Sequence, residues 1–123
     1  MTKEELKNRT KQFALRIIKL VSLLPINTVG RAIGNQLIRC GTSVGANYRS
    51  ACRARSKAEF IAKLGIVIEE TDESGFWFEL IIESGIMNRK LIEPLLTEAG
   101  ELTAIFTSSV NSAKYGKRPK SKI

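Results

Sequence analysis

Apolar residues recur at helical spacing in four successive stretches of this chain. The first stretch opens with a T-x-x-E capping box at Thr2 and Glu5. Its apolar positions are Leu6, Phe13, Ile17, Leu20 and Leu24. Pro25 follows them and cannot continue a helix, so the pattern predicts one helix between these two signals.

Three further helices are predicted, each with its own boundary signals. The second pattern runs from residue 29 to about residue 54. The third runs from residue 57 to about residue 83, between a capping box at Ser56 and Glu59 and a stop at Gly85. Asn88 can cap a fourth helix, in which Pro94 lies close enough to the start to predict an irregular first turn. Its apolar positions are Ile92, Leu95, Leu96, Ala99, Leu102, Phe106 and Val110.

Short connections between long helices favour antiparallel neighbours. The 123 residues suit one domain, and no stretch alternates apolar and polar residues as a strand does. The predicted fold class is therefore all-α, an up-down-up-down antiparallel four-helix bundle over residues 1–113. Residues 114–123 are predicted to form a basic, flexible tail.

The second helix sorts three classes of residue onto three arcs at about 100° per residue. One arc is apolar and contains Val29, Ile33, Cys40, Val44 and Ala51. The next has only small residues, namely Gly30, Gly34, Gly41, Gly45 and Cys52. The third contains the arginines, Arg31, Arg39, Arg49 and Arg53.

The glycines of the second helix need an explanation, because each costs a helix roughly 1 kcal/mol relative to alanine. A stripe of small residues lets another helix approach closely, which offsets that cost. A phosphate-binding loop is not indicated, because Gly45 is followed by Ala46 rather than by Lys and Ser or Thr, and no strand precedes it.

The third helix has apolar residues on two arcs. The first arc is the expected core face, with Phe60, Ile61, Leu64, Ile68, Gly75, Phe78 and Ile82. The second has Ile66, Trp77, Leu80 and Ile81 among charged residues. This second arc is either a wide core contact within the monomer or a subunit interface in which Trp77 is the anchor, since tryptophan is enriched at such anchors.

Charge is distributed unevenly around a formal net charge of +8. Residues 1–55 have 11 basic and 2 acidic residues, and residues 56–113 have 4 basic and 10 acidic ones. The arginine arc and a basic tail are typical of a nucleic-acid-binding protein. We therefore predict contacts from Arg31, Arg39, Arg49, Arg53, Lys114, Lys117, Arg118 and Lys120. The alternatives are a solvated face, or pairing of the basic helices of one subunit with the acidic third helix of the next.

Catalysis is not indicated, and no catalytic residue, metal site or cofactor is predicted. Histidine, the commonest general base and metal ligand, is absent from the sequence. Glu69, Glu70 and Glu73 could hold a divalent ion, but such clusters are more often solvated or paired with arginine. Cys40 and Cys52 would lie about 18 Å apart on one helix, too far for a disulfide. Reduced thiols, with no signal peptide or membrane-spanning run, predict a cytoplasmic protein.

The pattern resembles a family of small four-helix-bundle proteins encoded in intervening sequences of bacterial large-subunit ribosomal RNA genes, which are often labelled ribosomal proteins. The resemblance covers residues 3–113. The matching motifs are Asn35-Gln36-Leu37-x-Arg39, Ser43-Val44-Gly45-Ala46-Asn47-Tyr48-Arg49, Ser56-Lys57-Ala58-Glu59-Phe60, Glu73-Ser74-Gly75-Phe76-Trp77-Phe78 and Glu98-x-x-Glu101-Leu102.

The resemblance implies a left-handed bundle and a ring-shaped homo-oligomer, a pentamer. Related accessory proteins of diversity-generating retroelements form such pentamers and bind nucleic acid and a reverse transcriptase, so this chain could bind RNA, DNA or a protein of that class. The sequence thus predicts a non-enzymatic, homo-oligomeric protein that binds RNA or DNA through backbone electrostatics. The alternative is an assembly scaffold or protein adaptor without a nucleic-acid role.

Overall fold

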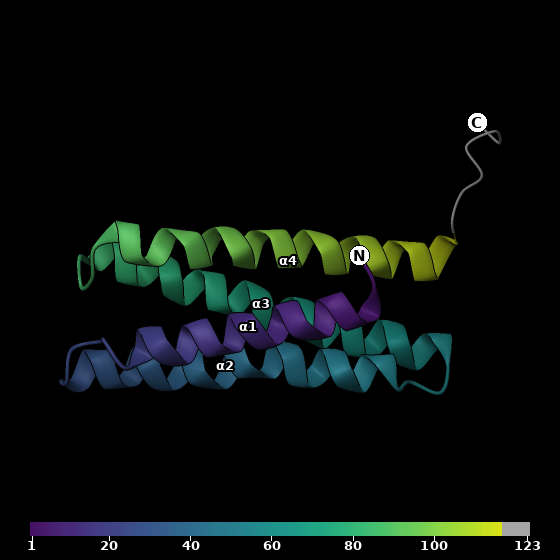
Figure 1. The fold of residues 1–123 in the computed structure, drawn as a ribbon, viewed down its shortest axis with the longest axis horizontal. Helices are drawn as coiled ribbons and strands as arrows, with labels where there is room; N and C mark the ends of the chain where they lie inside the picture. The colour runs from purple at the N-terminus through teal and green to yellow at the C-terminus, as the bar shows by residue number, and fades with distance from the viewer. Residues whose placement is uncertain (117–123) are drawn as a thin grey trace.

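A computed structural model describes residues 1–116, which form a four-helix bundle with antiparallel neighbours (Figure 1). Its helices are α1 (Lys3–Val21), α2 (Thr28–Cys52), α3 (Lys57–Ser84) and α4 (Arg89–Tyr115). The predicted fold class is confirmed. α4 extends past residue 113, so that Lys114 belongs to its last turn rather than to the tail. The other predicted tail contacts, Lys117, Arg118 and Lys120, lie outside the described residues.

Side-chain caps begin α1 and α3 where the sequence predicts them. At α1 the capping box is complete, because Thr2 accepts from the Glu5 N–H and Glu5 accepts from the Thr2 N–H. At α3 the box differs by one residue. Ser56 accepts from the Glu59 N–H, but the Glu59 carboxylate accepts from the N–H of Arg55 instead. In both caps, side-chain oxygens accept from N–H groups at the helix start, which have no backbone partner within the helix.

The other boundaries also agree with local signals. Asn27 accepts from the Gly30 N–H at the start of α2, and Asn88 accepts from the Lys90 N–H at the start of α4. Gly85 ends α3 at φ 73°, in the left-handed region that favours glycine. The first turn of α4 is irregular, as predicted: the Leu91 N–H donates to the Asn88 carbonyl three residues back, at 3.0 Å, whereas the other three helices begin with bonds to the carbonyl four residues back. From residue 89 onward α4 is nevertheless uninterrupted.

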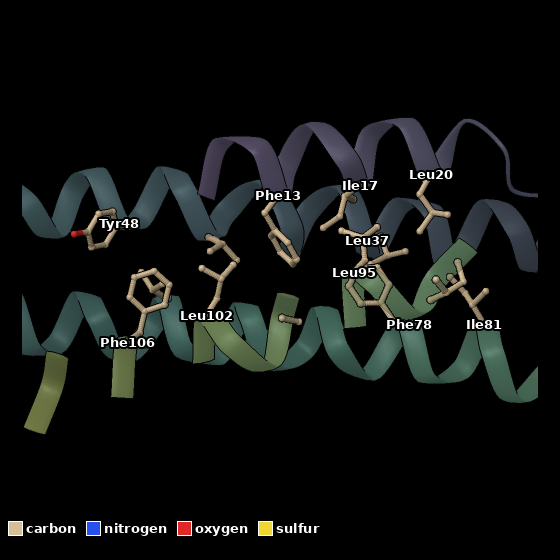
Figure 2. Close-up of a cluster of buried hydrophobic side chains, with 14 of the residues drawn as sticks. Phe13, Ile17, Leu20, Leu37, Tyr48, Phe78, Ile81, Leu95, Leu102 and Phe106 are labelled. Atoms are coloured by element: carbon tan, nitrogen blue, oxygen red, sulfur yellow. The ribbon is translucent and has the colours of Figure 1, made fainter. Parts of the chain in front are cut away.

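Aromatic side chains join the two diagonal pairs of helices across the core (Figure 2). Phe13 of α1 meets Phe78 of α3 edge to face, with ring centroids 6.3 Å apart. Tyr48 of α2 packs on Phe106 of α4 at 5.2 Å. All four rings are buried. Such ring pairs stabilise the fold beyond the burial of the rings themselves, so they help hold α1 against α3 and α2 against α4.

The glycine stripe of α2 lies where other segments of the chain approach the α2 backbone closely. A Cβ atom on Gly30 would lie 1.9 Å from the Pro25 carbonyl oxygen, and one on Gly41 would lie 2.3 Å from Cδ1 of Ile17. One on Gly45 would lie 3.2 Å from Oγ1 of Thr10. The close approach predicted for the stripe is confirmed, and the approaching segments are α1 and the turn that follows it.

Arg9 links α1 to α4, which otherwise approach each other at few points. Its Nε and Nη2 atoms donate to the two carboxylate oxygens of Glu98, each at 2.7 Å. Nη2 also donates to Glu101 at 2.7 Å. The two parallel hydrogen bonds to Glu98 fit the planar guanidinium group against the planar carboxylate, which fixes the orientation of the pair. Arg9 is therefore a structural residue of the bundle.

The core face of α3 differs from the predicted one. Ile81, predicted at a subunit interface, is completely buried in the core. Of the predicted core residues with large side chains, four are only half-buried: Phe60, Ile61, Ile68 and Ile82. The buried residues of α3 are Leu64, Val67, Thr71, Ser74, Phe78 and Ile81. Isoleucine and aromatic residues occur around much of this helix, so its periodicity does not define one face.

Two polar residues of α3 lie in the core because their hydroxyl groups are bonded locally. Thr71 donates to the Val67 carbonyl at 2.7 Å, and Ser74 donates to the Glu70 carbonyl at 2.9 Å. These bonds make burial of the two small side chains inexpensive. On α2 an apolar residue is exposed instead: Val29, predicted on the apolar face, is 53% exposed in the first turn.

Candidate nucleic-acid interface

Basic residues from all four helices gather at one end of the bundle. Antiparallel packing brings together the start of α1, the α2–α3 connection and the end of α4. We define the basic end as residues 1–11, 49–63 and 105–116. It has ten basic and three acidic residues, and one of the ten, Arg9, is paired with Glu98 and Glu101 of α4. Such an excess creates a positive potential that attracts polyanions.

A hollow of about 410 Å³ opens at the basic end between α1 and α2. We call it the basic hollow. Its lining is Glu4, Lys7, Asn8, Lys11, Arg49 and Arg53. Within residues 1–116 no carboxylate forms an ion pair with Lys11, Arg49 or Arg53. The hollow thus presents cations whose hydrogen-bonding capacity is available to a ligand.

Arg49 and Arg53 are the two predicted contact residues that line the basic hollow. They lie one helical turn apart at the end of α2, and both are exposed. Arg31 is exposed as well, but 22 residues of helix separate it from Arg53, a distance of about 33 Å. Arg31 therefore belongs to the opposite end of the bundle.

Arg39 is the predicted contact residue whose charge is already paired. Its guanidinium donates to Glu73 and lies 3.5 Å from Glu70, both on α3. The Glu73 carboxylate also accepts from the indole N–H of Trp77 at 3.1 Å. Hydrogen bonds from Arg39 and Trp77 lower the pKa of Glu73. Arg39 thus ties α2 to α3, and two members of the suspected acidic cluster are its partners.

Lys7 and Lys11 belong to the hollow although no sequence pattern predicted them as contact residues. They lie four residues apart, and that spacing places them on one face of α1. The spacing alone is a weak signal. In combination with an antiparallel bundle, which puts the start of α1 beside the end of α2, it would have indicated this site.

The outer surface of α3 differs in charge from the basic end. Ile66, Phe76 and Leu80 are exposed there, at 43%, 51% and 36%. Exposed carboxylates surround them, namely Glu69, Asp72, Glu79 and Glu83. Trp77 is half-buried and packs against the core. Of the predicted interface residues, Ile66 and Leu80 are thus the accessible ones.

The two cysteines are free thiols on α2, as predicted. Cys40 is buried, and its burial raises the pKa of the thiol. A raised pKa keeps this sulfur in its unreactive protonated form. Residues 1–116 also contain no group of three or more histidine, cysteine, aspartate or glutamate side chains arranged to hold a metal ion.

Residues 2–108 match the family model of the 23S rRNA-intervening sequence protein. The chain belongs to this family. A solved structure from Bacteroides thetaiotaomicron, described as a protein with unknown function from the S23 ribosomal protein family, is 32% identical to it. The match covers 90% of this chain and 99% of that one, with a TM-score of 0.83. No curated protein matches the chain.

Family membership agrees with the resemblance found in the sequence and with the four-helix fold. The solved relative is itself described as a protein of unknown function, so its match supports the fold and the family. No helix within residues 1–116 is both long and apolar enough to cross a membrane.

Proposed function

We propose that this protein is a non-enzymatic homo-oligomer that binds RNA or DNA through the phosphate backbone. The observation that supports this most directly is the basic end, where segments distant in sequence combine ten basic residues with three acidic ones. Phosphate contacts from arginine and lysine provide affinity without selecting a sequence. The exposed arginines of the basic hollow suit phosphate, because their planar groups can donate two parallel hydrogen bonds.

A salt series tests this function. We would measure binding of the purified protein to labelled structured RNA and to duplex DNA, beside a form shortened to residues 1–116. Both forms are expected to bind, with the logarithm of affinity falling linearly against the logarithm of salt concentration by about 0.9 per phosphate contact on duplex DNA. Absence of binding by the full-length protein at low salt would contradict the proposal.

The shortened form locates the contacts. It keeps the basic end but lacks four lysines and arginines, Lys117, Arg118, Lys120 and Lys122. A moderate decrease in affinity with a shallower salt slope is expected. Loss of all binding on truncation would assign the function to the tail and not to the bundle.

A second proposal is an assembly scaffold or adaptor, and the outer surface of α3 favours it. Exposed apolar residues surrounded by carboxylates suit a basic surface of another subunit or of a protein partner, including one of the reverse-transcriptase class implied by the resemblance. If charge pairing holds the oligomer together, high salt is expected to dissociate it. An oligomer that persists in high salt contradicts charge pairing.

Substitutions on α3 test the subunit interface. Trp77→Ala and Leu80→Ser are each expected to shift the mass measured by light scattering toward the monomer, because interface energy concentrates at a few apolar anchors. Trp77 also contacts the core, so its variant requires circular dichroism to show that the fold is kept. Leu80 is more exposed, and an unchanged mass for Leu80→Ser would exclude this surface as the interface.

A further inference from the structure

The basic hollow has a lining with no surface for a nucleobase. Each side chain that lines it in the described part of the chain is charged or an amide, and none is aromatic or aliphatic. Proteins that hold unpaired bases stack them on aromatic side chains. The exposed aromatic residues of residues 1–116 are Phe76 and Tyr115, and neither lines this hollow. The ligand that fits is therefore anionic rather than planar.

The cations of the hollow are arranged in two pairs. Lys7 and Lys11 lie one turn apart on α1, and Arg49 and Arg53 lie one turn apart at the end of α2. Residues four apart on a helix have Cβ atoms about 5–6 Å from each other. Each helix thus contributes two neighbouring donors, and the hollow between the helices is shared by both pairs. This pattern suits two adjacent phosphate groups better than a single small anion.

We infer that the basic hollow binds two successive phosphates of a nucleic-acid strand. Arg49 and Arg53 would donate paired hydrogen bonds to the phosphate oxygens, and Lys7 and Lys11 would supply point charges. This inference rests on the proposed function and adds the position and chemistry of the contact. A free polyphosphate has the same chemistry, so the experiment must separate the two sources.

Glu4 is the carboxylate that lines the hollow, and it already interacts with one of the four cations. Its Oε1 lies 3.2 Å from Nζ of Lys7, and its side chain is 83% exposed. An anionic ligand must compete with this carboxylate for Lys7. Glu4→Gln is therefore expected to strengthen phosphate binding, whereas a change that only weakened the fold would not.

The test is a titration of the isotope-labelled full-length protein with pyrophosphate, followed by nuclear magnetic resonance at ionic strength matched with sodium chloride. Shifts are expected at residues 4–11 and at the guanidinium signals of Arg49 and Arg53. Arg53→Gln is expected to weaken pyrophosphate binding about tenfold, and Glu4→Gln to strengthen it. Arg31→Gln, an exposed arginine at the other end of α2, is the matched control and is expected to change nothing.

The same variants are then measured with labelled duplex DNA and structured RNA. If the hollow binds the strand, Arg53→Gln must weaken nucleic-acid and pyrophosphate binding together. Pyrophosphate must also displace the nucleic acid more effectively than sodium chloride of equal ionic strength. The inference would be overturned if pyrophosphate shifted the guanidinium signals of Arg31 and Arg53 equally. It would also be overturned if pyrophosphate caused no larger shifts than sodium chloride does.

Two further outcomes separate this inference from the proposed function. Nucleic-acid binding that survives Arg53→Gln and Arg49→Gln unchanged would leave the proposed function intact and overturn the placement of the strand. Pyrophosphate binding in the hollow without any nucleic-acid binding by the wild-type protein would overturn both, and would assign the hollow to a free polyphosphate.

Discussion

Reversing Arg49 and Arg53 to glutamate is expected to weaken nucleic-acid binding about a hundredfold or more. Each arginine loses a charge-assisted hydrogen bond, about 1.5–3 kcal/mol, and the new carboxylate repels the phosphate. The salt dependence should become shallower by about 0.9 for each phosphate group that the variant no longer binds. Binding isotherms across the salt series measure both quantities.

The control must change the net charge equally, because steering by the whole protein also affects affinity. Arg16→Glu with Arg31→Glu does so at two exposed positions outside the basic hollow. This variant is expected to bind much more tightly than Arg49→Glu with Arg53→Glu. Equal affinities for both double variants would show that net charge and not the hollow determines binding.

Gly30→Ala is expected to destabilise the bundle by about 1–2 kcal/mol, although alanine is the better helix former. The added methyl group would lie 1.9 Å from the Pro25 carbonyl oxygen, and backbone cannot move aside as a flexible side chain can. Overpacking of this kind costs about 1–3 kcal/mol or more. The helix-propensity gain of roughly 1 kcal/mol offsets only part of that cost. Urea unfolding followed by far-ultraviolet circular dichroism measures the change.

Gly100→Ala is the matched substitution, because no atom lies within 4 Å of the position of its Cβ. It is expected to raise the free energy of unfolding by about 0.5–1 kcal/mol, through helix propensity alone. Gly41→Ala should fall between the two, since the end of the Ile17 side chain can rotate away. If Gly30→Ala also stabilised the protein, the close contact between α2 and the preceding turn would be wrong.

The helices and their caps were predictable because their signals are local. Thr2, Asn88 and Gly85 each act within a few residues, through a hydrogen bond or a backbone conformation. The glycine stripe of α2 was likewise visible as a periodic pattern, and it correctly indicated a close helix contact. The sequence did not show that α1 and the following turn make that contact.

The core face of α3 could not be derived from periodicity. Apolar residues lie on more than one arc of this helix, and the choice among arcs depends on how α2 and α4 flank it. Packing buries Ile81 together with Thr71 and Ser74, whose hydroxyl groups are bonded within the helix. A polar residue can therefore replace an apolar one in the core without leaving an unpaired hydrogen-bonding group.

The sequence by itself determined the four helices, the N-caps of three of them, the uneven charge and the family resemblance, since all of these depend on residue type and short-range spacing. Only the tertiary structure decided which charges act together. It pairs Arg39 with α3 and joins Lys7 and Lys11 to Arg49 and Arg53 in one hollow. The physical reason is that antiparallel packing brings the start of one helix beside the end of the next, so residues that are distant in sequence share one electrostatic field.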